Sequence, residues 1–282
     1  PSSSPSSGFF VAVGEDGKAV RSINDGASWD NETCQMFTDL YGVTSGNDTI
    51  IAVGQGGKIL RSTNNASSFS TVSSYYSYDS WGATFGNNTF VGVNNSGRTG
   101  RSTNDGSSFS SAVYSNLNQT LRGIAFGNDT FIAVGLEYYG RIVRSTNDGV
   151  SWSSVNTSYP RRYHYGIAFG NNTFVAVGQY GKVQKSTNEG ENWSNSSSGI
   201  STQLNGITFG NSTFVAVGAS GIIITSSNGS SWNSRSTPIS SELKGVAFGN
   251  NTFVAVGVGG KILRSTDNGA NWSDVTSPIT TD

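Results

Sequence analysis

Six positions in this sequence, spaced 39 to 43 residues apart, carry side chains that could bind a ligand. They are Tyr41, Trp81, Arg122, Tyr165, Asn205 and Lys244. Flat aromatic rings give a large contact area at low entropy cost, and Arg, Lys and Asn add directional hydrogen bonds. Sugar-binding and protein-binding surfaces use these residue types. We therefore predict a ligand-binding set of these six residues with Tyr139 and Arg162 from nearby loops, although unconstrained loop variation would produce similar variety.

The same sequence gives little support for catalysis. Its arginines Arg98, Arg122, Arg161, Arg162 and Arg235 are scattered, and its loop acids Asp39, Asp79, Glu137 and Glu242 form no obvious pair. Two paired carboxylates are the usual requirement for glycoside hydrolysis. His164 is the only histidine, which disfavours a histidine-based metal site or a Ser-His-Asp triad. We predict no catalytic residue, no metal, no cofactor and no enzymatic activity.

An internal repeat positions these residues. An element of the type VAVG ends at Gly14, Gly54, Asn94, Gly135, Gly178, Gly218 and Gly257, and residues 170–193 match residues 249–272 at 16 of 24 positions. A period of about 40 residues is typical of propellers and solenoids. Each complete copy contains four short segments, as expected for one propeller blade. The sequence thus predicts an all-β fold: a seven-bladed β-propeller of four-stranded antiparallel blades.

A second recurring motif lies between the third and fourth segments of each copy. It reads Ser-X-Asn/Asp-X-Gly-X-Ser/Asn-Trp/Phe, for example from Ser186 to Trp193 and from Ser265 to Trp272. The Asn or Asp side chain can bond nearby backbone groups, and the glycine can adopt a positive φ. We expect looser turns where Ala66 replaces the glycine and where Ser227 replaces the Asn or Asp.

These motifs resemble Asp boxes, also called BNR repeats, over essentially the whole chain. Such repeats occur in sialidases and in the photosystem II stability factor family of seven-bladed propellers. The resemblance implies the fold and leaves the function open, because enzymes, assembly factors and binding proteins share it. A sialidase would require an arginine cluster and a Tyr nucleophile with an acidic partner, and the family's surrounding motifs are missing here.

Composition bears on partners and location. The net charge of −1 disfavours nucleic acid, and no apolar run is long enough to cross a bilayer, so we expect no membrane insertion. Cys34 is the only cysteine, so an internal disulfide is excluded. Fifteen Asn-X-Ser/Thr sequons suggest export, although Asn, Ser and Thr are also ordinary turn residues. We predict glycosylation at Asn31, Asn47, Asn87, Asn94, Asn118, Asn128, Asn156, Asn171, Asn195, Asn211 and Asn250.

The two ends of the chain raise a question about the first blade. Residues 1–7 resemble a linker or a weak strand, and residues 8–282 are expected to form one propeller. The first repeat lacks the segment that would form its innermost strand, and the chain stops just before another such segment would be due. We expect three good strands in blade one and an inner position that is weakly filled or filled by another molecule. An open strand edge of this kind can template strand addition.

The combined prediction is an extracellular or cell-surface binding or structural propeller. It would recognise a glycan or a surface protein through its variable loop face, and its open edge allows self-association into a filament or layer. The alternatives are a sialidase-like glycoside-processing enzyme and an intracellular assembly factor.

Overall fold

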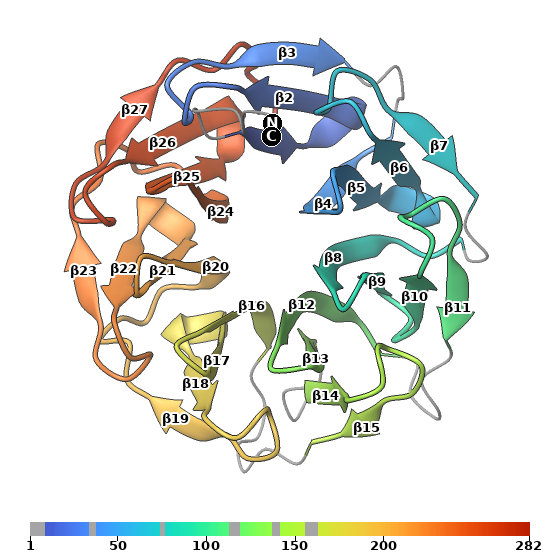
Figure 1. Cartoon of the computed structure of the whole chain (residues 1–282). Helices are drawn as coiled ribbons and strands as arrows, with labels where there is room; N and C mark the ends of the chain where they lie inside the picture. Colours follow the sequence, from blue (N-terminus) through green and yellow to red (C-terminus); the bar gives the residue numbers. More distant parts are fainter. Residues whose placement is uncertain (1–8, 34–37, 74–76, 113–118, 137–141, 156–162) are drawn as a thin grey trace, which may run out of the picture.

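The computed structural model describes residues 9–33, 38–73, 77–112, 119–136, 142–155 and 163–282, and these form seven antiparallel sheets arranged in a ring (Figure 1). The protein is an all-β, seven-bladed β-propeller, as the sequence predicts. Residues 1–7, predicted to be a linker or weak strand, lie outside the described residues, as does Cys34.

Each blade runs from the central channel to the rim in chain order. Blade one contains β1 (Phe10–Val13), β2 (Lys18–Ser22) and β3 (Asp30–Thr33); blade two contains β4 (Leu40–Gly46), β5 (Thr49–Gly54), β6 (Ile59–Ser62) and β7 (Ser70–Val72); blade three contains β8 (Ser80–Gly86), β9 (Thr89–Asn94), β10 (Thr99–Ser102) and β11 (Ser110–Ala112). Blade four contains β12 (Leu121–Gly127), β13 (Thr130–Gly135), β14 (Ile142–Ser145) and β15 (Ser153–Ser154); blade five contains β16 (His164–Gly170), β17 (Thr173–Gly178), β18 (Val183–Ser186) and β19 (Ser194–Ser196). Blade six contains β20 (Leu204–Gly210), β21 (Thr213–Gly218), β22 (Ile223–Ser226) and β23 (Asn233–Arg235); blade seven contains β24 (Leu243–Gly249), β25 (Thr252–Gly257), β26 (Lys261–Ser265) and β27 (Ser273–Val275).

Blade one differs from the other six. Its described residues form three strands, in the order β1-β2-β3, whereas every other sheet has four. The expectation that residues 2–7 fill its inner position poorly lies outside the described residues.

The inner hairpins turn on two left-handed residues. In blade five these are Asn171 and Asn172, with φ of 47° and 53°. Two consecutive positive φ values define a type I′ turn, the turn that matches the twist of paired strands and favours Asn. The hydroxyl of Thr173 donates to the carbonyl of Asn171 at 3.2 Å. Turn geometry therefore accounts for the recurring Asn-X-Thr sequence motif.

The core lies between neighbouring blades. The second strands of the four-stranded blades are buried along all or nearly all of their length, for example β13 and β17. In five blades a Phe of the inner strand packs against a Phe of the second strand, with ring centroids 4.6 Å apart, as for Phe169 and Phe174. Burial of both faces explains why this segment is apolar at successive positions rather than alternating.

The Ser-X-Asn turn before each outer strand is held by side-chain hydrogen bonds. In blade five, the Ser186 hydroxyl donates to Asn188 Oδ1 at 2.9 Å and accepts from the Gly190 amide at 2.9 Å. The indole of Trp193 donates to the Gly190 carbonyl at 3.1 Å. The turn therefore fixes the position of the aromatic residue that packs between blades.

Both expected looser turns keep this bonding. The Ala66 amide bonds the Ser62 hydroxyl at 3.0 Å, as the glycine does elsewhere, although Ala66 must adopt a φ of 58°. In blade six the turn is one residue shorter, and Asn228, not Ser227, takes the Asn role by accepting from the Ser226 hydroxyl at 3.2 Å. The expectation was wrong because the serine anchor, and not the substituted position, holds the turn.

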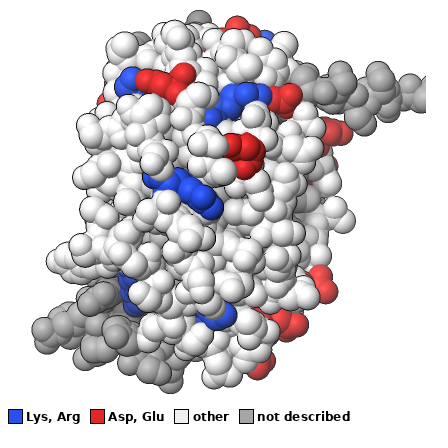
Figure 2. Space-filling view, turned by 90° about the vertical axis from the view of Figure 1, so that its left-hand side faces the viewer, with Lys and Arg blue, Asp and Glu red and all other residues white. Residues whose placement is uncertain are grey.

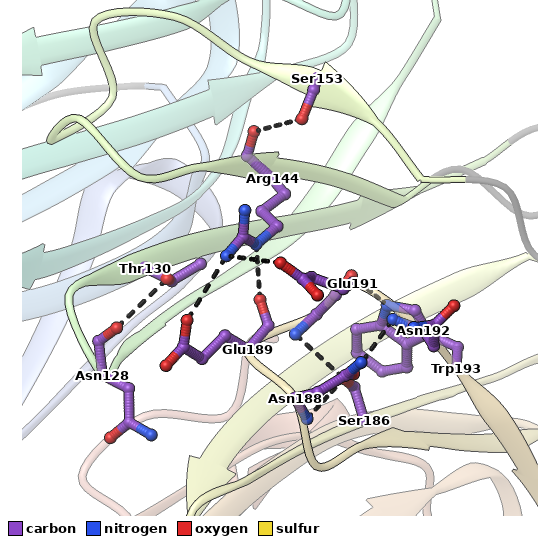
Figure 3. A network of polar contacts seen from close by, with 11 residues as sticks. Asn128, Thr130, Arg144, Ser153, Ser186, Asn188, Glu189, Glu191, Asn192 and Trp193 are labelled. Atoms are coloured by element: carbon purple, nitrogen blue, oxygen red, sulfur yellow. Dashed lines mark hydrogen bonds and ion pairs between the residues drawn. The ribbon is translucent and has the colours of Figure 1, made fainter.

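A cationic side chain connects each of several blades to the next. Arg144 of blade four donates from Nε to the Glu189 carbonyl in the turn of blade five at 2.7 Å, and its guanidinium lies 3.5 Å from the Glu189 carboxylate (Figure 3). Arg264 of blade seven makes the same bond to the Asp25 carbonyl of blade one at 2.6 Å. This contact closes the ring at its rim.

One buried position breaks the pattern of the inner strands. His164 is fully buried where Leu40, Leu121, Leu204 and Leu243 stand in other blades. Burial, with a smaller effect of the Lys182 charge, lowers the pKa of His164 to about 3. The imidazole is therefore neutral in the folded protein across the physiological range.

This depressed pKa predicts acid sensitivity. Below pH 6.5 the unfolded chain binds a proton at His164 that the folded protein does not. The free energy of unfolding is therefore highest above pH 6.5, and it decreases as the pH falls towards 3. Between pH 8 and pH 5 the loss is about 2 kcal/mol. Urea unfolding of the protein and of His164→Leu at both pH values would measure it. If the free energy of unfolding depended on pH equally in the two proteins, the lowered pKa of His164 would be contradicted.

Candidate functional site

The six ring residues predicted from their spacing occupy equivalent structural positions. Each is the second residue of an inner strand, at a register shift of the inner hairpin, as between Leu40 and Gly42 in blade two. The same shift recurs in the other five four-stranded blades. A β-bulge redirects a side chain out of the regular alternation. The six residues thus lie within the inner strands, at the bulge of each inner hairpin.

The bulges bring all six residues together around one cavity. It has a volume of about 420 Å³ and is lined by the ring residues, by Asp39, Gln203 and Glu242, and by residues of blades one and seven such as Val13 and Val256. Tyr139 and Arg162, predicted to join the ring residues, lie outside the described residues. The ligand-binding role of the ring stays a prediction.

Aromatic and cationic side chains of the ring stack on one another. Tyr41 and Trp81 are stacked with centroids 4.4 Å apart, and the Arg122 guanidinium lies 4.0 Å from the Trp81 centroid and 5.5 Å from that of Tyr165. Burial lowers the pKa of Arg122 and raises the pKa of Tyr41 and of Tyr165. Among the described residues, no group accepts a hydrogen bond from the buried Arg122 Nε or Trp81 Nε1. The stack thus contains two buried donors that no described group satisfies.

The other half of the ring is already bonded internally. Asn205 donates to Glu242 at 2.8 Å, and Lys244 forms an ion pair with Glu242 at 2.7 Å. Although burial raises the pKa of Glu242, the hydrogen bonds from Lys244 and Asn205 outweigh it and lower that pKa overall. The charges of Lys244 and Glu242 therefore offset each other, and the Asn205 amide is engaged within the ring.

Of the residues considered for catalysis, Arg122, Asp39 and Glu242 line the cavity, and several make contacts that hold turns or strands. Asp39 accepts from the Asp16 amide at 3.1 Å and Asp79 from the Gly56 amide at 2.8 Å. Arg235 donates to the Thr225 hydroxyl at 2.8 Å, and Arg98 lies over Tyr78. Glu137, Arg161 and Arg162 lie outside the described residues.

The predicted glycosylation sites divide into three groups. Asn31, Asn47, Asn87, Asn128, Asn171, Asn195, Asn211 and Asn250 are exposed. Asn118 and Asn156 lie outside the described residues. Asn94 is fully buried, and its Oδ1 accepts from the Ser96 and Arg98 amides at 3.0 and 2.9 Å. The prediction at Asn94 is wrong, because this fold leaves no room for a glycan on a side chain that holds an internal turn.

Charge is sparse on the outer surface. The side of the ring seen in Figure 2 carries few Lys, Arg, Asp and Glu residues, some with opposite charges side by side, on a mostly uncharged surface. No cationic tract of the kind that binds phosphates gathers there. Among the described residues, no helix has the length and apolar character to cross a bilayer.

The fold and this cavity define a seven-bladed propeller with an aromatic-lined channel mouth. Neither family models nor curated proteins match the sequence. Solved structures do match: YCF48 bound to a D1 peptide has a TM-score of 0.73 and 16% identity, covering 95% of this chain and 88% of that one. YCF48 from Cyanidioschyzon merolae has a TM-score of 0.70 and 16% identity, covering 90% of each chain. A chain of a nidogen/laminin complex has a TM-score of 0.60 and 12% identity, covering 77% of this chain and 88% of that one. At these identities the likeness concerns the fold alone.

Proposed function

We propose that this protein is a non-enzymatic binding module that captures a protein segment at the channel mouth. The observation that carries the proposal is the Tyr41–Trp81–Arg122–Tyr165 stack, in which Arg122 Nε and Trp81 Nε1 are buried donors without a partner among the described residues. A buried donor without an acceptor costs about 1 to 3 kcal/mol. A ligand carboxylate or carbonyl that accepts from these groups would recover that cost.

A peptide suits this site for two reasons. Its carbonyl and carboxylate groups supply the acceptors, and its side chains can pack against the rings of Tyr41 and Tyr165. YCF48, similar in fold, has been solved with a bound D1 peptide, which supports a protein ligand. An intracellular assembly factor is the second candidate function. In the array experiment described below, binding to a glycan instead of a peptide would be the other outcome.

The recurring Ser-X-Asn turns and their indole contacts also support membership of the Asp-box class of propellers. This assignment rests on the turn geometry, such as the Ser186–Asn188 and Trp193–Gly190 bonds. Membership of this class does not indicate a catalysed reaction, because the class includes both binding proteins and enzymes.

The binding proposal predicts a loss of affinity in Trp81→Ala. Peptide and glycan arrays would be probed with the purified protein, and the strongest hit would be titrated by calorimetry. We expect Trp81→Ala and Arg122→Met each to weaken binding by about 1 to 3 kcal/mol, because each removes a wall and a donor of the same stack. Ile23→Ala, an exposed apolar residue in the turn of blade one, is the matched control. Unchanged affinity in both ring variants would contradict the proposal.

We further propose an extracellular or cell-surface location with glycans on exposed sequons. The exposed Asn side chains support it, although the type I′ turns give those residues a structural reason of their own. Mass spectrometry of peptides from the native source, before and after enzymatic removal of N-glycans, should show sugar mass on these asparagines. Unmodified peptides at all of them would favour the intracellular alternative.

A further inference from the structure

A second cavity lies on blade five. It has a volume of about 400 Å³, within the range of about 300 to 1,000 Å³ that small-molecule pockets occupy. Its lining comes from the end of η3 (Gln179–Gly181), the start of β18, the end of β19 and the loop of residues 197–201. Among the described residues that line it, none also lines the channel-mouth cavity. The two cavities are therefore separate sites.

A small residue of the outer strand accounts for this cavity. By strand register, Ser196 is equivalent to Val72 of blade two and Val275 of blade seven, which pack in hydrophobic clusters. In blade six the equivalent residue is Arg235, whose Nε donates to the Thr225 hydroxyl at 2.8 Å. Ser196 is too short to fill the same space, and it brings a hydroxyl group to the cavity instead.

The loop at the edge of the cavity is fixed at its base and open at its tip. The Ser198 hydroxyl donates to the Gly181 carbonyl at 2.6 Å, as the Thr237 hydroxyl of blade six donates to the Gly221 carbonyl at 2.9 Å. The next residue is a proline in blades six and seven, but it is Gly199 in blade five. A Cβ added at Gly199 would have no described atom within 4 Å. The loop thus leaves the cavity accessible.

Tyr180 stands at the edge of the cavity in an unfavourable backbone conformation. Its φ is 56°, at a central position of η3 where blades two and seven have Gly56 and Gly259. A left-handed backbone suits glycine, and a bulky residue that adopts it is an outlier. The side chain is 59% exposed, so burial in the core does not offset this cost. Backbone strain of this kind is concentrated at functional sites.

A buried glutamine orients the amide of Asn195, which also lines the cavity. Gln184 is 2% exposed and donates from Nε2 to Asn195 Oδ1 at 2.9 Å. By register, the equivalent residues in blades two, six and seven are the apolar Leu60, Ile224 and Leu263. The bond leaves the Asn195 Nδ2 as a donor, and among the described residues no group accepts from it.

We propose that this cavity binds one uncharged sugar residue, with the flat face of the sugar against the ring of Tyr180. The ring supplies an apolar wall. The hydroxyl groups of Ser196 and Ser201 can both donate and accept, and the Asn195 amide donates, as the hydroxyl groups of a sugar require. Among the described lining residues there is no carboxylate, and Lys182 is only 6% exposed, so the lining favours an uncharged ligand.

The test uses the methyl glycosides of glucose, galactose, mannose and N-acetylglucosamine, each titrated into the 282-residue chain. The protein is expressed in bacteria, because Asn195 is also a predicted glycosylation site. We expect at least one glycoside to bind saturably. Its dissociation constant should be on the order of 1 mM, which corresponds to about 13 non-hydrogen atoms at the ligand efficiency of drug-sized molecules. The amide NMR signals of Ser196 and Gly199 should shift during the titration.

Two substitutions remove the site with residues that the fold already accepts in other blades. Ser196→Val introduces the valine of blades two and seven, and Tyr180→Gly introduces the glycine of the same two blades. Both variants should keep or exceed the melting temperature of the parent, and each should weaken binding at least about tenfold. Ser220→Gly is the matched control, because it makes the corresponding change at the equivalent left-handed position of blade six. It should bind normally.

Three outcomes would overturn the proposal. The first is that none of the four glycosides binds saturably, and the second is that both variants bind as the parent does. The third is that the shifts are confined to ring residues such as Tyr41, which would place the sugar at the channel mouth. Trp81→Ala should bind the glycoside normally, so this site and the channel-mouth site can fail independently.

Discussion

Replacing Trp272 by Ala is expected to lower the free energy of unfolding by about 3 to 5 kcal/mol. The indole is 8% exposed and packs in a cluster with Val215 of blade six and Phe253 of its own blade. Its Nε1 donates to the Gly269 carbonyl at 3.1 Å. The substitution therefore opens a cavity between two blades and leaves a buried carbonyl without its donor. Trp193, which is half-buried, should lose less when replaced by Ala.

Urea unfolding followed by circular dichroism would measure this loss. Trp81→Ala is the matched control, because it makes the same chemical change at the channel mouth, outside the inter-blade core. We expect the control to lose about 1 to 2 kcal/mol, less than Trp272→Ala, because Trp81 is half-buried and stacks on Tyr41 and Arg122. A Trp272→Ala protein as stable as the parent would mean that the Ser-X-Asn turns do not position this ring for packing.

A second large effect is expected from adding one methyl group at Gly170. This glycine is buried against the Phe209 ring, and an added Cβ would overlap three ring atoms. Phe209 itself packs on Phe214, with centroids 4.6 Å apart, so the ring cannot withdraw without disturbing the core of blade six. Overpacking of this kind costs about 3 kcal/mol. We expect Gly170→Ala to be destabilised by that amount.

Gly249→Ala provides the matched comparison for that substitution. It adds the same methyl at the same position of another inner strand, where the nearest atom would be 3.4 Å away. Its stability should lie within about 1 kcal/mol of the parent. Thermal unfolding of the two variants would show the contrast, and equal losses would indicate that the inner positions of blades one and six are filled alike.

The architecture could be predicted because the sequence repeats it. Each blade uses local rules that short segments carry by themselves: Asn in left-handed turns, Ser anchoring the turn before the outer strand, and apolar second strands such as β17. The prediction failed at two positions. The sequence at Asn94 fits a glycosylation sequon, and Ser227 aligns in sequence with the Asn or Asp of the turn motif. At Asn94 burial decides the outcome, and at Asn228 a one-residue deletion shifts the role of the asparagine.

The candidate site was predictable only in part. Equivalent spacing was enough to place Tyr41, Trp81 and Arg122 around one opening, since equivalent residues of a closed ring face its axis. Spacing does not reveal that Arg122 lies between two aromatic rings, because those contacts cross blades and depend on the bulge that redirects each side chain. It also does not reveal that Lys244 pairs with Glu242 of its own blade.

The sequence by itself determined the repeat, the strand order and the ring, because these follow from local propensity and from apolar segments that must be covered on both faces. Only the tertiary structure decided which interface is open. Gly249 and Gly170 have the same neighbours in sequence, and they differ because the covering Phe of an inner strand comes from the next blade, which the described part of blade one does not supply. Packing between blades is a relation between distant segments, and a repeated local pattern carries no information on whether the last neighbour is present.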